Sequence, residues 1–159
     1  MSMNWAEFSS ISAELATAVR ARFEANLHHV VATIGQDGAP RASGTEVRWW
    51  NDDLYLGSMP GSRKSADLKR DPRYSIHSHL DTSELLDGDA KLAGTAKLVD
   101  DAPKRQAFSA FIGHPGSDPY DLFRLAVSSA SLVRISDDKT HLVITSWTER
   151  AGTTAIDRY

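Results

Sequence analysis

The sequence QDGAPRASGTEVRWWNDDLYLGSMPGSRKSADLKRDPRYSI, residues 36–76, decides the fold that we predict for this chain. Residues 36–38 and 51–52 have the composition of hairpin turns, and segments rich in β-forming residues flank both of them. A short helical pattern follows at residues 62–70 and ends before Pro72, because proline disfavours helix in the residue that precedes it. We therefore predict three antiparallel strands and one short helix. The strands are residues 40–50, 53–59 and 73–80.

The same pattern continues on both sides of this stretch. Apolar residues recur at three- and four-residue steps through residues 4–26, which predicts an amphipathic N-terminal helix. A β-branched run at residues 28–35 predicts the strand that precedes the first hairpin. Gly94 lies in a further predicted strand, residues 90–99, where it indicates a β-bulge or a close backbone approach. We also expect helices at residues 102–114 and 120–129 and a hairpin of strands at residues 131–136 and 141–148.

These elements predict a mainly antiparallel β-barrel of six to seven strands with flanking helices. The strands are not separated by regular long helices, which argues against a doubly wound parallel sheet. We expect a single domain over residues 1–159, with the N-terminal helix first and a barrel at about residues 28–148. Residues 149–159 form a short tail without a clear pattern.

The composition limits the classes of partner. The chain has 18 Lys and Arg and 21 Asp and Glu, a net charge of -3, which argues against a nucleic-acid or anionic-membrane binder. It has no cysteine, and none of its apolar runs reaches the roughly 18 residues of a membrane span. The first residues lack the basic and apolar segments of a secretory signal, so we expect a cytoplasmic protein.

The segment GSMPGSRKS, residues 57–65, has the composition of an anion site. It is not a nucleotide-triphosphate loop, because the spacing and the residue before the lysine are both wrong. A helix that begins near Ser62 would still present unpaired backbone N–H groups and a partial positive charge. Ser62, Arg63 and Lys64 would add charge-assisted hydrogen bonds. The alternative is that Ser62 only caps the helix and that the two cations are solvated.

Residues 28–148 resemble the pyridoxamine 5'-phosphate oxidase-like family, the FMN-binding split β-barrel group of flavin and deazaflavin oxidoreductases. The resemblance is strongest at residues 37–73, where DGAPR, LYLGS, and RK followed by DPR occur in the family's order. It implies a six-stranded split barrel and a homodimer with each cofactor in a groove at the interface. The cofactor phosphate would lie at Ser62, Arg63 and Lys64. The ring would lie along Thr45, Glu46, Val47, Gly57, Ser58 and Met59.

The resemblance also implies an oxidoreductase that transfers a hydride between FMN or coenzyme F420 and a small unsaturated or quinone-like substrate. Likeness to the smaller actinobacterial members favours F420, whose long anionic tail would need further cations. The candidates for these are Arg41, Arg48, Lys69 and Arg70. Members that oxidise pyridoxamine phosphate carry further substrate-phosphate residues near the C-terminus, and the tail here has no clear equivalent. Two alternatives stay open: a non-catalytic carrier of F420 or FMN, and a haem-binding split barrel.

The candidates for donating a proton to the reduced substrate are Glu46, His77 and His79. His77 and His79 are two residues apart, so on a strand both imidazoles lie on one face. Two such imidazoles also suit a metal site, but no third ligand has suitable spacing, and we predict no metal. The redox chemistry itself would belong to the cofactor.

Overall fold

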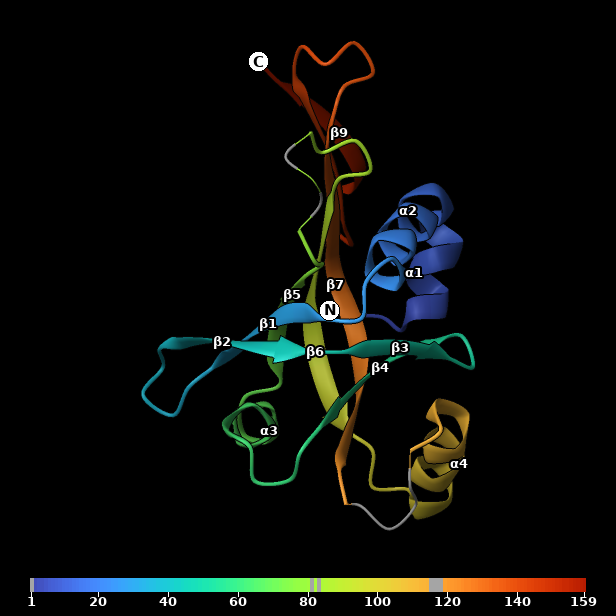
Figure 1. The fold of residues 1–159 in the computed structure, drawn as a ribbon, viewed down its shortest axis with the longest axis vertical. Coiled ribbons are helices and arrows are strands. Elements are labelled where there is room, and N and C mark those ends of the chain that lie inside the picture. The colour runs from blue at the N-terminus through green and yellow to red at the C-terminus, as the bar shows by residue number, and fades with distance from the viewer. Residues whose placement is uncertain (1, 81, 83, 115–118) are drawn as a thin grey trace.

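The computed structural model describes residues 2–80, 82, 84–114 and 119–159, which form four helices and nine strands (Figure 1). The helices are α1 (Trp5–Ile11), α2 (Ala13–Glu24), α3 (Arg63–Arg70) and α4 (Ala102–Ile112). The strands are β1 (His29–Ile34), β2 (Pro40–Thr45), β3 (Val47–Trp50), β4 (Asp53–Ser58), β5 (Arg73–His77), β6 (Asp89–Leu98), β7 (Asp121–Ile135), β8 (Leu142–Thr148) and β9 (Gly152–Arg158). No helix in this part of the chain is long and apolar enough to cross a membrane.

The strands pair in the order β2-β1-β5-β6-β7-β4-β3, and each of these pairings is antiparallel. β7 has 15 residues; its first part pairs with β4 and its last part with β8. β9 pairs with the outer side of β8, so the tail that showed no sequence pattern adds a strand. The mainly antiparallel split-barrel prediction is confirmed, although the described residues form nine strands and not six or seven.

The barrel is split at Glu46. Thr45, at the end of β2, pairs with β1 at one edge of the sheet, whereas Val47, at the start of β3, pairs with β4 at the other edge. Figure 1 shows β2 and β3 lying end to end across the longer strands. The prediction of one continuous strand at residues 40–50 is therefore wrong. The chain changes from one edge of the sheet to the other at a single residue, Glu46.

The predicted helix at residues 4–26 is two helices, because the chain breaks at Ser12. Ser12 ends α1 and begins α2 with φ -131° and ψ 59°, which is not helical. Its hydroxyl lies 2.7 Å from Thr153 Oγ1, so a tertiary contact with β9 accompanies the break. The break leaves Ile11 61% exposed, although it belongs to the apolar residues that recur at three- and four-residue steps through residues 4–26.

Both N-terminal helices bury aromatic and aliphatic side chains against the barrel. The ring of Trp5 lies 5.0 Å from that of Trp49, and the ring of Phe8 lies 4.8 Å from that of Trp147, measured between centroids. Large rings bury the most apolar area per residue, so these contacts contribute strongly to the core.

The prediction of a helix at residues 120–129 is wrong, because residues 121–129 form the first part of β7. Phe123 packs in the main core, whereas Leu122 packs with Tyr55 and Phe108 in a second cluster beside α4. Both faces of β7 are therefore buried at its start, and the run of apolar residues there has the spacing of a helical pattern.

The expectation at Gly94 is confirmed. The register between β6 and β7 shifts between Ala93 and Gly94, which is a β-bulge or similar irregularity. A Cβ atom added at Gly94 would overlap the carbonyl oxygen of Ala126, so the two backbones also approach closely.

Candidate functional site

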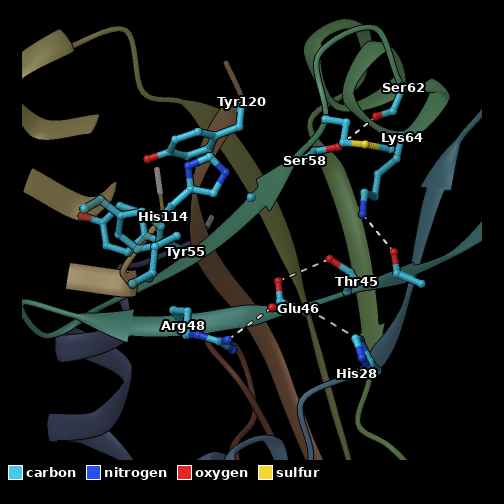
Figure 2. A pocket seen from close by; sticks show the side chains of 15 residues that line it. His28, Thr45, Glu46, Arg48, Tyr55, Ser58, Ser62, Lys64, His114 and Tyr120 are labelled. Carbon is cyan, nitrogen blue, oxygen red and sulfur yellow. Dashed lines mark hydrogen bonds and ion pairs between the residues drawn. The ribbon is translucent and has the colours of Figure 1, made fainter. Parts of the chain in front are cut away.

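A cavity of about 570 Å³ lies beside the split in the barrel, between the start of α3 and α4 (Figure 2). Typical small-molecule sites have about 300–1,000 Å³, so this volume suits a cofactor. The lining residues are His28, Gly44, Thr45, Glu46, Arg48, Tyr55, Gly57, Ser58, Met59, Ser62, Lys64, Phe108, Ile112, His114 and Tyr120.

One end of the cavity is the turn that begins α3. Ser62 is the N-cap residue, and its side chain accepts a hydrogen bond from the backbone N–H of Ser65 at 3.1 Å. The hydroxyl oxygens of Ser58 and Ser62 are 2.8 Å apart. The first turn of a helix leaves backbone N–H groups without helical partners and carries a partial positive charge. This end of the cavity is therefore suited to an anion.

Lys64 adds a cation to the same end. Its ammonium donates a hydrogen bond to the backbone carbonyl of Gly44 at 2.9 Å, which links α3 to β2. Burial lowers the pKa of Lys64 below that of an ordinary lysine, and the nearby Glu46 carboxylate opposes this shift. An anion bound beside Lys64 would stabilise the charged form of the side chain.

A buried carboxylate fixes α3 against the β1–β2 hairpin. Asp67 accepts hydrogen bonds from Thr33 at 2.8 Å, Arg41 at 2.8 Å and Arg70 at 3.1 Å. Burial acts to raise the pKa of Asp67, but these hydrogen bonds outweigh it, and the pKa lies below the usual value. Arg41 and Arg70, two cations proposed for a long anionic tail, are thus paired with Asp67 and do not line the cavity.

Lys69, the third of these cations, is paired on another side of α3. Its ammonium lies 2.8 Å from a carboxylate oxygen of Asp121, which also accepts a hydrogen bond from Ser65. Of the four cations proposed for the tail, Arg48 alone lines the cavity.

Glu46 lies where the barrel is split and forms part of the cavity wall (Figure 2). Its carboxylate lies 3.2 Å from the Arg48 guanidinium and 3.7 Å from Nδ1 of His28. The sequence offered no reason to place His28 here, because it was expected to be an ordinary strand residue. These contacts connect β3 with the residue before β1, across the split.

The other end of the cavity is aromatic. Tyr55 projects from β4, and its ring lies 5.4 Å from the ring of Phe108 on α4. The ring of His114 lies 5.1 Å from that of Tyr120. Figure 2 shows Tyr55, His114 and Tyr120 grouped across the cavity from Ser62. Such a group offers apolar surfaces to a flat ring.

Seven of the nine residues predicted to bind a cofactor line this one cavity: Thr45, Glu46, Gly57, Ser58, Met59, Ser62 and Lys64. Val47 is 5% exposed and belongs to the barrel core. Arg63 is exposed and is not among the lining residues. The fold therefore collects the predicted residues from β2, β4 and α3, and their role in binding remains a prediction.

The three candidate proton donors separate in the structure. Glu46 lines the cavity, whereas His77 and His79 do not. Nδ1 of His77 lies 2.7 Å from the carbonyl oxygen of Ser78, and the backbone N–H of His79 donates to Nδ1 of His29 at 2.9 Å. Among the described residues, no group of three His, Asp or Glu is arranged to hold a metal ion.

Sequence reasoning missed the residues that α4 and the start of β7 bring to the cavity. Phe108, Ile112, His114 and Tyr120 reach it because the start of β7 pairs with β4. No local sequence signal marks that pairing, and finding these residues required the strand assignment of β7.

The solved structures that share this fold include the following three. An FMN binding protein related to pyridoxamine 5'-phosphate oxidase, from Nostoc punctiforme, has a TM-score of 0.64 and 16% identity, covering 92% of this chain and 95% of that chain. PhzG from Burkholderia lata, in complex with tetrahydrophenazine-1-carboxylic acid, has a TM-score of 0.63 and 14% identity, covering 96% and 92%. A protein related to general stress protein 26, from Clostridium acetobutylicum, has a TM-score of 0.61 and 14% identity, covering 82% and 92%. These identities support the fold alone.

The sequence itself identifies the family. The comparison with curated proteins finds no match. The profile of the family described as pyridoxamine 5'-phosphate oxidase matches residues 15–134, which is most of the chain. The resemblance inferred from residues 28–148 is therefore confirmed, and the chain belongs to the pyridoxamine 5'-phosphate oxidase family.

Proposed function

We propose that the protein binds FMN in the cavity beside Glu46 and acts as a flavin-dependent oxidoreductase. The observation that carries this proposal is the division of the cavity into two ends. Ser62 and Lys64 form an anion-binding end, and Tyr55 and Tyr120 belong to an aromatic end. FMN has the same two parts, a phosphate and a flat ring. The family match and the fold shared with an FMN binding protein support the same cofactor class.

The lining residues fit FMN in charge and in shape. The hydroxyls of Ser58 and Ser62 and the ammonium of Lys64 would hold the phosphate. Gly44 and Gly57 would leave flat backbone beside the ring, since a Cβ added at Gly44 would meet no other heavy atom within 4 Å.

The pairing of the nearby cations favours FMN over coenzyme F420. The oligoglutamate tail of F420 would need cations beyond the phosphate end. Arg41 and Arg70 are bonded to Asp67, and Lys69 is bonded to Asp121. FMN needs only the cation that lines the phosphate end, Lys64. We therefore propose FMN and treat F420, which the resemblance favoured, as the competing outcome of the test.

We also propose that a second copy of the chain covers the cavity. Met59 is 77% exposed and Ile112 is 37% exposed, and both line the cavity. The neighbouring Phe111 is 53% exposed. Apolar side chains gathered at the mouth of a cavity often mark an interface, and a homodimer would bury them and exclude water from the ring.

When bound and reduced by an external two-electron donor such as NAD(P)H, FMN would supply the hydride and return to its oxidised form. The chain would position a small unsaturated or quinone-like acceptor against the ring at the aromatic end, which lowers the entropic part of the barrier. An acceptor that takes up a hydride also takes up one proton. Glu46 lines the cavity with His28 at 3.7 Å, and we assign the delivery of this proton to that pair.

A parallel titration of the purified apo-protein with FMN, F420 and haem tests the proposal. We expect the dissociation constant for FMN to be at least about tenfold below that for F420. Tighter binding of F420 would reassign the cofactor, and binding of haem alone would refute the phosphate end. Turnover with quinones and enones then separates the enzyme from a carrier, because a carrier would not reoxidise its reduced FMN over many cycles.

A further inference from the structure

A second cavity, of about 550 Å³, adjoins the first one. His114 and Tyr120 line both cavities. The rest of the wall comes mainly from α4, including Arg105 and Ser109. Nothing in the proposed binding of FMN uses this second space.

Two residues that line the second cavity each carry a buried side-chain nitrogen without a hydrogen-bond partner. These nitrogens are Nε of Arg105 and Nδ1 of His114, and neither has a partner in the part of the chain that the structure describes. Buried polar groups are almost always hydrogen-bonded, because leaving one unpaired costs the full free energy of its desolvation. These two nitrogens have almost no accessible surface, but the terminal nitrogens of Arg105 are accessible and form no hydrogen bond or ion pair with the described residues. The cavity is therefore lined by a guanidinium that a ligand can pair with.

The chemistry of these atoms selects the ligand. The guanidinium of Arg105 only donates hydrogen bonds, so its partner must be an acceptor. Arg105 is also the one charged side chain, apart from any charge on His114, among the described residues that line this cavity. The charge of Arg105 is one of the causes that lower the pKa of Asp121, but the Asp121 carboxylate is bonded to Ser65 and Lys69 and not to Arg105. A carboxylate has the required charge and two acceptor oxygens.

The wall around these atoms is held by a hydrogen-bonded triad. The hydroxyl of Tyr120 donates to the backbone carbonyl of Arg105 at 2.9 Å and lies 2.7 Å from the Ser109 hydroxyl. Ser109 donates to the same carbonyl at 3.0 Å. The triad links α4 to Tyr120, the residue before β7. These hydrogen bonds hold the α4 backbone at Arg105 in place. The ring of Tyr120, Ala102 and Pro119 supply apolar surface for the body of the ligand.

We propose that the second cavity binds the carboxylate of a small aromatic or unsaturated acid. That this acid is the substrate of the flavin reaction rests on the proposed function, whereas the carboxylate site does not. His114 and Tyr120 belong to both cavities, so an acid held at Arg105 lies next to the aromatic end where the flavin ring would bind.

Calorimetric titration of the full chain with benzoate and with benzamide tests the site, because the two probes share a shape and differ in charge. We expect benzoate to bind at least about tenfold more tightly than benzamide. Arg105→Met should weaken benzoate binding at least about tenfold and leave benzamide unchanged, and Arg105→Lys should fall between the wild type and Arg105→Met. The matched control Arg150→Met removes an arginine from the exposed β8–β9 turn and should change neither affinity.

The His114 contribution has its own pair of variants. His114→Phe keeps a ring and loses the donor, so benzoate binding should weaken; His114→Asn keeps a donor and should restore part of it. Equal affinities for benzoate and benzamide, or an Arg105→Met variant that folds normally and binds benzoate as the wild type does, would overturn the proposal. FMN titration separates the two proposals: FMN binding without benzoate binding refutes the carboxylate site alone, and benzoate binding without FMN binding refutes the proposed cofactor alone.

Discussion

The two ends of the first cavity are built in different ways. The anion end comes from one short segment, in which Ser58, Ser62 and Lys64 are close in sequence and lie at the surface of the barrel. The aromatic end comes from separate elements, with Tyr55 on β4 and Phe108 on α4. These two residues also belong to a buried cluster. The comparison implies that the aromatic end contributes more to the stability of the fold than the anion end, where Ser62 caps α3 and Lys64 bonds to Gly44 at the edge of the barrel.

The largest expected effect is at the aromatic end. Phe108 is 2% exposed and packs against Trp50 and Tyr55, with ring centroids 5.6 Å and 5.4 Å away. Phe108→Ala removes this ring from the second core cluster, so we expect the free energy of unfolding to fall by about 3–5 kcal/mol. Urea denaturation followed by tryptophan fluorescence measures the change.

Phe111 on the same helix provides the matched control. It is 53% exposed, although its ring stacks on Trp50 at 6.3 Å. Measured on the monomer, Phe111→Ala should cost less than about 1 kcal/mol, because about half of its side chain makes no contact within the chain. If both variants lost the same stability, α4 would not be held by the buried cluster and the distinction between the two ends would fail.

The next effect is at the anion end and concerns binding. Lys64→Ala removes a charge-assisted hydrogen bond of about 1.5–3 kcal/mol to the phosphate, so FMN should bind about 10–100-fold more weakly. The free energy of unfolding should change by less than about 1 kcal/mol, because Lys64 is only partly buried. Fluorescence titration and urea denaturation on the same sample give both values.

Arg63 is the matched control for Lys64, because it is the adjacent cation and does not line the cavity. Arg63→Ala should leave FMN affinity within about threefold of the wild type, since an exposed charge is screened by solvent. Equal losses in the two variants would mean that the general positive potential of the turn binds the phosphate, and that the sequence-based inclusion of Arg63 was justified.

The same contrast explains what the sequence could predict. Ser62 is followed by a basic helical pattern and, at the far end, by Pro72, so the turn and the start of α3 were predictable from local rules. The Gly94 bulge was predictable in the same way, because a glycine inside a strand weakens the strand and usually marks a bulge or a close backbone approach.

The remaining features depend on pairing between distant segments. The β-forming pattern of residues 40–50 continues through Glu46, and only closure of the sheet divides it. Val47 was expected to line the cavity. Because the chain moves to the other edge of the sheet at Glu46, Val47 pairs with β4 and its side chain lies in the core. Tyr120 reaches the cavity because β7 pairs with β4, and the burial of both faces at the start of β7 made its pattern look helical.

The smallest expected effect is the pH dependence of FMN binding at the anion end. Burial lowers the pKa of Lys64 below the usual 10.5, so in the free protein this side chain loses its charge at a lower pH than other lysines. A bound phosphate stabilises the charged form and raises the pKa in the complex. Affinity should therefore be constant below the pKa of the free protein and fall as pH rises through it. Because the phosphate is doubly charged above its second pKa of about 6, it does not change over this range.

Titrations of FMN between pH 7.5 and about 10 with the wild type and Lys64→Ala measure this effect. Deprotonation removes the charge of Lys64 and leaves its side chain in place, so the loss of affinity in the wild type cannot exceed the loss caused by Lys64→Ala. The two affinities should converge as pH rises, and the variant should show no such fall. A fall of equal size in Lys64→Ala would assign the titration to another group and leave the anion end without evidence that Lys64 contributes its charge.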